Sequence, residues 1–268
     1  MLRKYSNSRS LSDNLKLGSL TAFTAGMVNV ASLIVFFGFS SNVTGHYAIL
    51  AEEISLGNWT QVAVVFSWIF LFFFGNFTSN LIIINFNRKY TYIAHATPIV
   101  LEIICLLAVG VYGIYYYQET LFETEVLLGL MLFAMGLQNG LTASISNFAV
   151  KTTHLTGATT DLGILFSMFT KKKYREHPEL IAKAKLLGTV AICYLGGAVF
   201  SGLLFKSIEF KVFYVVSAFL VILISYDWYK ISLLNYLKSN RQVKTKKKYS
   251  ELEIFPKSKR EKEGSLAS

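Results

Sequence analysis

Six long apolar runs constrain this chain more than any other feature of its sequence. At about 1.5 Å per residue, a helix of about 20 residues crosses a hydrocarbon core of about 30 Å. A soluble domain can bury one such helix, but it cannot bury six of them around one core. The runs lie at about 17–38, 62–86, 94–117, 126–148, 186–206 and 212–232. We therefore predict an all-α membrane protein with six transmembrane helices.

Composition supports this class and argues against a nucleic-acid-binding protein. Of the 268 residues, 53% are hydrophobic and only 16% are charged, which is too apolar for an ordinary soluble domain. The formal net charge of +10 by itself suggests a nucleic-acid partner. However, the basic residues lie between and after the apolar runs, where they set topology and contact anionic lipid. We expect membrane lipids as partners and no nucleic acid.

The distribution of basic residues predicts the orientation. If the N-terminus is cytoplasmic, 24 of the 26 Lys and Arg residues fall on the cytoplasmic side, and only Lys206 and Lys211 lie in an outer turn. The first apolar run is too long for a secretory signal and has no A-x-A cleavage pattern, so it is expected to remain as a helix. The predicted location is the bacterial cytoplasmic (inner) membrane, with multiple passes and both termini in the cytoplasm.

The chain divides into four predicted regions. Residues 1–16 form a cytoplasmic N-terminus, 17–117 a first three-helix repeat and 118–238 a second one. Residues 239–268 are rich in lysine and poor in apolar residues, which predicts a disordered cytoplasmic tail that contacts the anionic leaflet.

The two predicted repeats share a pattern of small and polar residues. In each, a Gly-x-x-Asn motif on the first helix is followed by a Thr-Gly pair. The motifs are Gly26–Asn29 with Asn42-Val43-Thr44-Gly45-His46, and Gly136–Asn139 with His154-Leu155-Thr156-Gly157. Because each repeat has three crossings, an odd number, the second enters the membrane from the opposite side. This is an inverted-topology repeat, in which a site near the midplane between the halves is expected.

A short run follows each Thr-Gly pair, and two interpretations of these runs stay open. The first run ends in Glu52 and Glu53, and the second extends from Thr159 to Phe169. As half-helices, they would have Thr44 and Thr156 near their starts. They are either re-entrant half-helices, whose N-termini face each other and favour an anion or a carbonyl group, or interfacial amphipathic helices on opposite surfaces.

These motifs, together with Thr152-Thr153 and Thr160-Asp161-Leu162, resemble those of the YoaK-type family of bacterial multipass membrane proteins, a domain of unknown function. The resemblance covers about residues 15–235. It implies a helical membrane fold, and it implies no particular reaction or substrate.

The predicted substrate-binding residues come from the repeated motifs and from one acid near the second of them. They are Asn29, Thr44, Gly45, His46, Asn139, His154, Thr156, Gly157 and Asp161. Each has a structural alternative. The two asparagines can instead join helices by hydrogen bonds, and Asp161 can cap the first turn of the second half-helix. The two histidines flank their Thr-Gly pairs on opposite sides, so metal ligation is not expected.

Glu102 is the proton-coupling candidate, because a carboxylate in an apolar stretch is costly unless it is paired or protonated. The alternative is an acid that snorkels to the inner interface or caps a helix there. Cys105 and Cys193 lie inside apolar runs and predict no disulfide.

The sequence contains no catalytic or phosphate-binding signature, such as G-x-S-x-G or H-E-x-x-H. We therefore expect no enzyme activity, no catalytic residue, no metal and no cofactor. The leading prediction is a transporter or channel-like permease for a small polar or anionic solute, with homo-oligomerisation left open. The alternative is a non-transporting membrane module that binds lipid or organises a partner through its basic tail.

Overall fold

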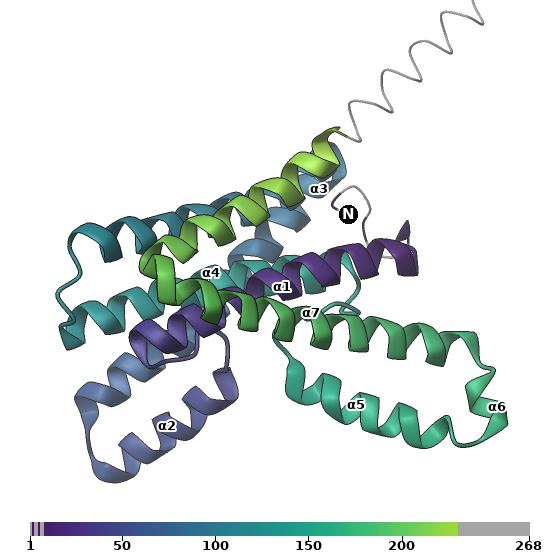
Figure 1. The fold of residues 1–268 in the computed structure, drawn as a ribbon, viewed down its shortest axis with the longest axis horizontal. Coiled ribbons are helices and arrows are strands. Elements are labelled where there is room, and N and C mark those ends of the chain that lie inside the picture. Colours follow the sequence, from purple (N-terminus) through teal and green to yellow (C-terminus); the bar gives the residue numbers. More distant parts are fainter. Residues whose placement is uncertain (1, 3–4, 6–7, 230–268) are drawn as a thin grey trace, which may run out of the picture. The chain divides into compact units, whose positions relative to one another are not determined.

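The structure of the protein is a computed structural model, and it describes residues 2, 5 and 8–229. The chain divides into two compact units, Met1–Ile224 and Ser225–Ser268, and the helical fold is that of the first unit. The predicted tail 239–268 lies outside the described residues. The described part contains helices and no strand (Figure 1). The helices are α1 (Leu11–Phe36), α2 (Val43–Leu56), α3 (Trp59–Tyr115), α4 (Leu121–Ile145), α5 (Leu155–Met168), α6 (Lys172–Arg175) and α7 (Pro178–Ile208), followed by the 3-10 turn η2 (Glu209–Lys211) and a helix from 212.

Four helical segments of the described residues are long and apolar enough to cross a membrane. They are Leu11–Phe36, Trp59–Tyr115, Leu121–Ile145 and Pro178–Tyr229. The predicted all-α membrane class is therefore confirmed. The segments number four, whereas six apolar runs were predicted, because two pairs of runs are joined without a loop.

The first joined pair is α3, which was expected to contain a loop at Arg88 and Lys89. The helical hydrogen-bond pattern continues through this region, and only Tyr90 departs from it, with φ −137° and ψ 62°. A straight helix of 57 residues would be about 85 Å long, far more than a bilayer needs. Figure 1 shows that α3 instead turns back on itself, so it has a first arm, 59–89, and a second arm, 91–115. The second pair is joined at η2, where Glu209 has a positive φ of 47°.

Two similar capping boxes begin α1 and α4. The Ser10 hydroxyl accepts a hydrogen bond from the Asp13 amide, and the Asp13 carboxylate accepts one from the Ser10 amide. Thr120 and Glu123 make the same reciprocal pair at α4. Each box satisfies two amides that a helix start leaves unpaired. For this reason α1 begins at Leu11, whereas the first transmembrane helix was predicted to begin near residue 17.

Helices α1 and α7 cross at two glycines, where their backbones touch. A Cβ on Gly26 would lie 2.0 Å from the carbonyl oxygen of Tyr194, and a Cβ on Gly197 would lie 1.9 Å from that of Phe23. No side chain fits in either place. Small residues of this kind let membrane helices approach closely, and α1 packs on α7 along much of its length.

Helix α4 and the first arm of α3 cross in the same way. A Cβ on Gly136 would lie 2.3 Å from the carbonyl oxygen of Phe72, and a Cβ on Gly75 would lie 2.3 Å from that of Phe133. The two crossings thus pair Gly26 with Gly136 as equivalent positions. They also match α7 with the first arm of α3, since Gly197 and Gly75 make the same contact.

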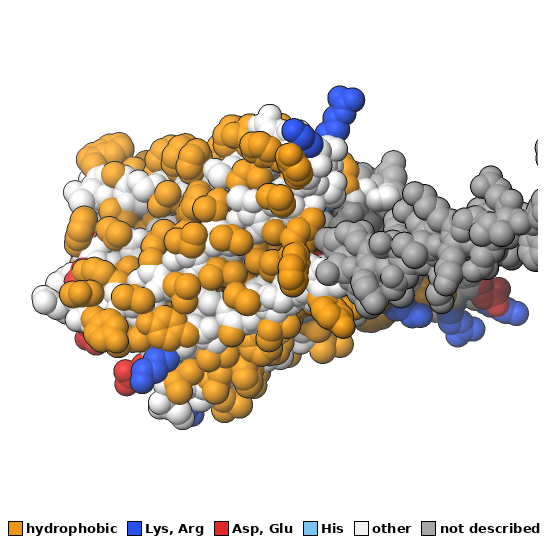
Figure 2. Space-filling view, turned by 90° about the horizontal axis from the view of Figure 1, so that it is seen from above, with side chains coloured by type: hydrophobic (Ala, Val, Ile, Leu, Met, Phe, Trp, Pro, Cys, Tyr) orange, Lys and Arg blue, Asp and Glu red, His pale blue; other side chains and the backbone are white. Residues whose placement is uncertain are grey.

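The outside of the helices is apolar. Figure 2 shows a face covered by hydrophobic side chains, with charged side chains near its edges. On the first arm of α3, Phe70, Phe73, Phe74 and Phe77 are all at least 43% exposed and lie against one another. An exposed apolar surface of this extent is typical of contact with lipid.

Candidate functional site

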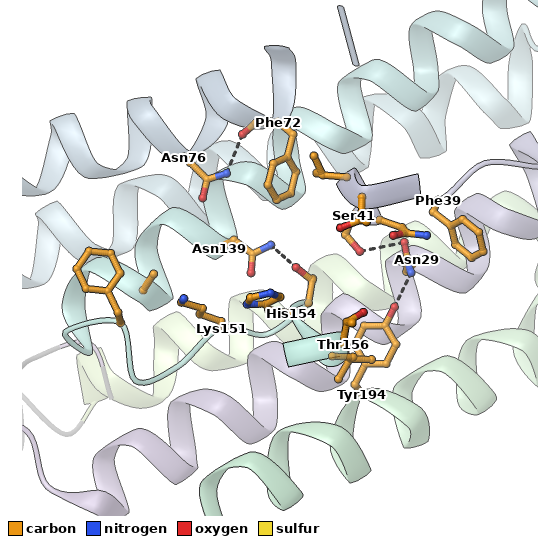
Figure 3. Close-up of a pocket in the computed structure, with 17 residues that line it drawn as sticks. Asn29, Phe39, Ser41, Phe72, Asn76, Asn139, Lys151, His154, Thr156 and Tyr194 are labelled. Atoms are coloured by element: carbon orange, nitrogen blue, oxygen red, sulfur yellow. Dashed lines mark hydrogen bonds between the residues drawn. The ribbon is translucent and has the colours of Figure 1, made fainter. Parts of the chain in front are cut away.

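A cavity of about 620 Å³ lies where α1, α4 and the starts of α2 and α5 come together (Figure 3). Its lining mixes amide, hydroxyl and aromatic groups. The lining residues are Asn29, Phe39, Ser41, Asn42, Val43, Thr44, Phe72, Asn76, Asn139, Ala143, Phe148, Lys151, Thr153, His154, Leu155, Thr156 and Tyr194. We call this space the central cavity.

Asn29 contributes from α1 and holds the loop that precedes α2. Its side-chain oxygen accepts hydrogen bonds from the hydroxyls of Ser40 at 3.2 Å and Ser41 at 3.1 Å. Its amide nitrogen donates to the hydroxyl of Tyr194 on α7 (Figure 3). The amide therefore fixes both the loop and the neighbouring helix, as the structural alternative for this residue expected.

Asn139 does the same from α4 for the loop that precedes α5. Its oxygen accepts from the Thr152 hydroxyl at 3.1 Å, and its nitrogen donates to Thr153 Oγ1 at 2.6 Å (Figure 3). In both halves the two hydroxyl residues come immediately before the residue that caps the following helix. Both asparagines line the central cavity, and both position its walls.

Helices α2 and α5 begin at the central cavity and point away from it in different directions (Figure 1). Asn42 caps α2, because its side-chain oxygen accepts a hydrogen bond from the Gly45 amide at 3.2 Å. His154 occupies the same position before α5, but its side chain makes no capping hydrogen bond. The first amides of α5 are therefore without a side-chain acceptor and lie beside Thr156 at the cavity.

The two glycines of the Thr-Gly pairs make room for the cap residues. A Cβ on Gly45 would lie 2.8 Å from the Asn42 amide nitrogen, and a Cβ on Gly157 would lie 3.1 Å from the His154 ring. Neither glycine lines the central cavity. Gly157 lines the second cavity, and the prediction that the two glycines receive the solute stays a prediction.

His46 is also set back from the cavity. Its side chain is buried, its Nε2 lies 2.8 Å from the carbonyl oxygen of Phe39, and its ring packs on Trp68 with centroids 5.5 Å apart. The structure thus gives it a role in packing α2 against the first arm of α3.

Asp161 was predicted to lie in the first turn of its helix, and this prediction is wrong. Because α5 begins at Leu155, Asp161 lies in the second turn. Its carboxylate forms an ion pair with Lys183 of α7, with an N–O distance of 2.8 Å. It lines a second cavity and is absent from the lining of the central one.

Glu102 lies in the second arm of α3 and belongs to neither cavity. Its side chain has no exposed surface, and neither carboxylate oxygen has a hydrogen-bond partner. This burial contradicts the alternative in which Glu102 snorkels to an interface. As a proton-coupling residue it would act away from the cavity.

Sequence reasoning missed several lining residues. Lys151 supplies the one Lys or Arg side chain of the central cavity, and Tyr194, Asn76, Ser41 and Thr153 add polar groups. The pairs Ser40-Ser41 and Thr152-Thr153 had a detectable signal, since each stands directly before the cap residue of its half-helix. Lys151 had no such signal in the sequence, because no basic residue stands at the corresponding place before α2.

The chain was compared with known proteins. A family profile described as "Protein of unknown function (DUF1275)" matches residues 17–226. No curated protein and no solved structure gives a significant match.

Proposed function

We propose, from the premise that this chain belongs to the DUF1275 family of proteins of unknown function, that it is a membrane permease for a small polar or anionic solute. The family match confirms the resemblance to the YoaK-type family over nearly the residues expected. Since the family has no assigned function, the proposal rests on the residues of this chain. It places the solute in the central cavity, between two inverted halves that together cross the membrane six times.

Three sets of contacts support the inverted repeat. The capping boxes of Ser10 and Thr120, the glycine crossings, and the asparagine hydrogen bonds each occur once in each half and in the same order. In the proposed topology α1 and the two arms of α3 are the three crossings of the first half. Helix α4, helix α7 and the helix from 212 are those of the second, so it begins on the opposite side.

The observation that carries the proposal is that one cavity is lined by the first turns of both half-helices and by the asparagine of both halves. Secondary transporters with inverted repeats bind substrates at such places, where helix N-termini meet between the halves. The uncapped amides of α5, the two helix dipoles and Lys151 all favour negative charge in this space. A module that only organises partners has no need of a polar cavity of this size.

The proposal is tested by a thermal-shift screen of the purified protein against a panel of small inorganic and organic anions and small neutral polar solutes. A ligand at about 100 times its dissociation constant stabilises a protein by about 2.7 kcal/mol, which is easily measured. We expect at least one solute to raise the melting temperature. Lys151→Gln and Thr156→Val should reduce that shift, because both residues line the central cavity.

Lys171→Gln is the matched control, since Lys171 is an exposed lysine just before α6 and lines neither cavity. It should keep the full shift. A panel without any stabilising solute, or a shift that survives both cavity substitutions, would contradict the proposed site.

The topology gives a separate prediction. In a cysteine-free background, a cysteine at Thr170, beside the basic turn of Lys171–Lys173, should be shielded from an impermeant thiol reagent in intact cells. A cysteine at Thr120, before α4, should react. Labelling of both positions from the same side would exclude the six-crossing arrangement.

A further inference from the structure

A second cavity, of about 650 Å³, adjoins the central one. Phe148, Lys151 and His154 line both cavities, so these three side chains stand between the two spaces. Its other walls come from the start of α1, from α5 and from the first part of α7, including the Asp161–Lys183 ion pair.

This second cavity lies toward the N-terminal end of α1. It is lined by Leu11, the first residue of α1, and by Asn14, whereas the central cavity contacts α1 at Asn29. The helix rises about 27 Å between Leu11 and Asn29. The second cavity therefore occupies the space between this end of the helices and the central cavity.

The equivalent place in the first half holds a larger side chain, Trp68. The glycine crossings match α7 with the first arm of α3, so Val190, Leu187 and Lys183 correspond to Trp68, Val65 and Gln61. The Trp68 indole donates a hydrogen bond to the carbonyl oxygen of Glu125 on α4 at 2.9 Å, and its ring packs on His46.

A second hydrogen bond closes the same place. Gln61 donates from Nε2 to the side chain of Glu125 at 2.9 Å, and Val65 is only 2% exposed. In the other half, Lys183 pairs with Asp161 of α5 and not with α1, and the small Val190 stands in the place of Trp68. The first arm of α3 is thus tied to α4 by two hydrogen bonds, whereas the equivalent part of α7 contacts α1 at Gly18, through the buried Val190, and lines the second cavity.

We propose that the second cavity is the vestibule through which the solute reaches the central cavity, and that Trp68 closes the equivalent passage in the other half. The structure then represents a state open toward the N-terminal end of α1. The opposite state would arise when the two halves exchange arrangements, as inverted repeats allow. The identity of the vestibule as a solute path rests on the proposed function, but its access to water can be tested without any solute.

The test measures how fast cysteines react with a charged, membrane-impermeant methanethiosulfonate reagent in the purified protein in lipid nanodiscs. Cys105 and Cys193 are first replaced by alanine, and single cysteines are placed at Leu187, Val65 and Ile192. We expect Leu187→Cys to react about tenfold faster than Val65→Cys, because a packed thiol reacts only when the structure opens locally. Ile192, whose side chain is 73% exposed on α7, is the control for lipid contact, and its cysteine should also react slowly.

Two reciprocal substitutions test the role of Trp68 separately from the vestibule. Trp68→Val copies Val190 and should speed the reaction of the cysteine at Val65. Val190→Trp should fill the vestibule and slow the reaction of the cysteine at Leu187. Size-exclusion profiles and labelling after denaturation check that each variant is folded and that its thiol is reactive.

Equal rates at Leu187 and Val65, or a faster reaction at Val65, would overturn the proposal that the second cavity is an open vestibule. Unchanged rates in both reciprocal variants would overturn the role of Trp68. If the expected rates were found but no solute shifted the melting temperature, the access of water to the second cavity would stand, and its role as a solute path would fail with the permease proposal.

Discussion

Gly197→Ala is expected to destabilise the protein strongly, by about 3 kcal/mol or more. The new Cβ would lie 1.9 Å from the carbonyl oxygen of Phe23, a backbone atom that cannot rotate away. To relieve this clash α1 and α7 must separate, and these two helices pack on each other extensively. The midpoint of chemical unfolding in detergent and the yield of monodisperse protein measure the effect.

Gly188→Ala is the matched control in the same helix. No atom lies within 4 Å of the position its Cβ would take, so stability should stay unchanged or rise by up to about 1 kcal/mol. If the two variants unfolded at the same midpoint, the crossing would not be the contact that holds α1 on α7.

Glu102→Met is expected to have the opposite effect and to raise the free energy of unfolding by about 2–4 kcal/mol. The wild-type carboxyl group is fully buried, and neither of its oxygens has a hydrogen-bond partner. Such a group is costly, whereas a flexible methionine fills a similar volume with apolar atoms. The same unfolding assay measures the change, and Glu102→Gln, which keeps a polar group, should gain less.

The same variants test whether this costly residue is functional. If Glu102 couples a proton to solute movement, Glu102→Met should lose any pH dependence of uptake by proteoliposomes while it gains stability, a common trade-off at functional sites. A loss of stability would show that the carboxyl group has a partner in another conformation, and it would remove the reason for treating it as a strained site.

The sequence could predict the class of fold and part of the repeat. A chain in lipid must satisfy its backbone hydrogen bonds internally, so the long apolar runs predict transmembrane helices. Gly26 with Asn29, and Gly136 with Asn139, are local motifs, so their equivalence can be recognised from the order of residues alone. The second half-helix was predicted to start near Thr156, and α5 begins at Leu155, but Asp161 lies in its second turn and not in the first turn that was predicted.

Only the tertiary structure decided which helices pair. In a bilayer the buried and the lipid-facing sides of a helix are both apolar, so periodicity does not identify the packed face. The structure pairs α1 with α7 at Gly26 and α4 with the first arm of α3 at Gly136, and all four of these helices line the central cavity. The placement of Lys151 in that cavity and the full burial of Glu102 were likewise visible only in the packed structure. The sequence by itself determined an all-helical membrane chain with a repeated motif, because those properties depend on local composition. The site depends on contacts between residues more than a hundred positions apart, which only the packed helices specify.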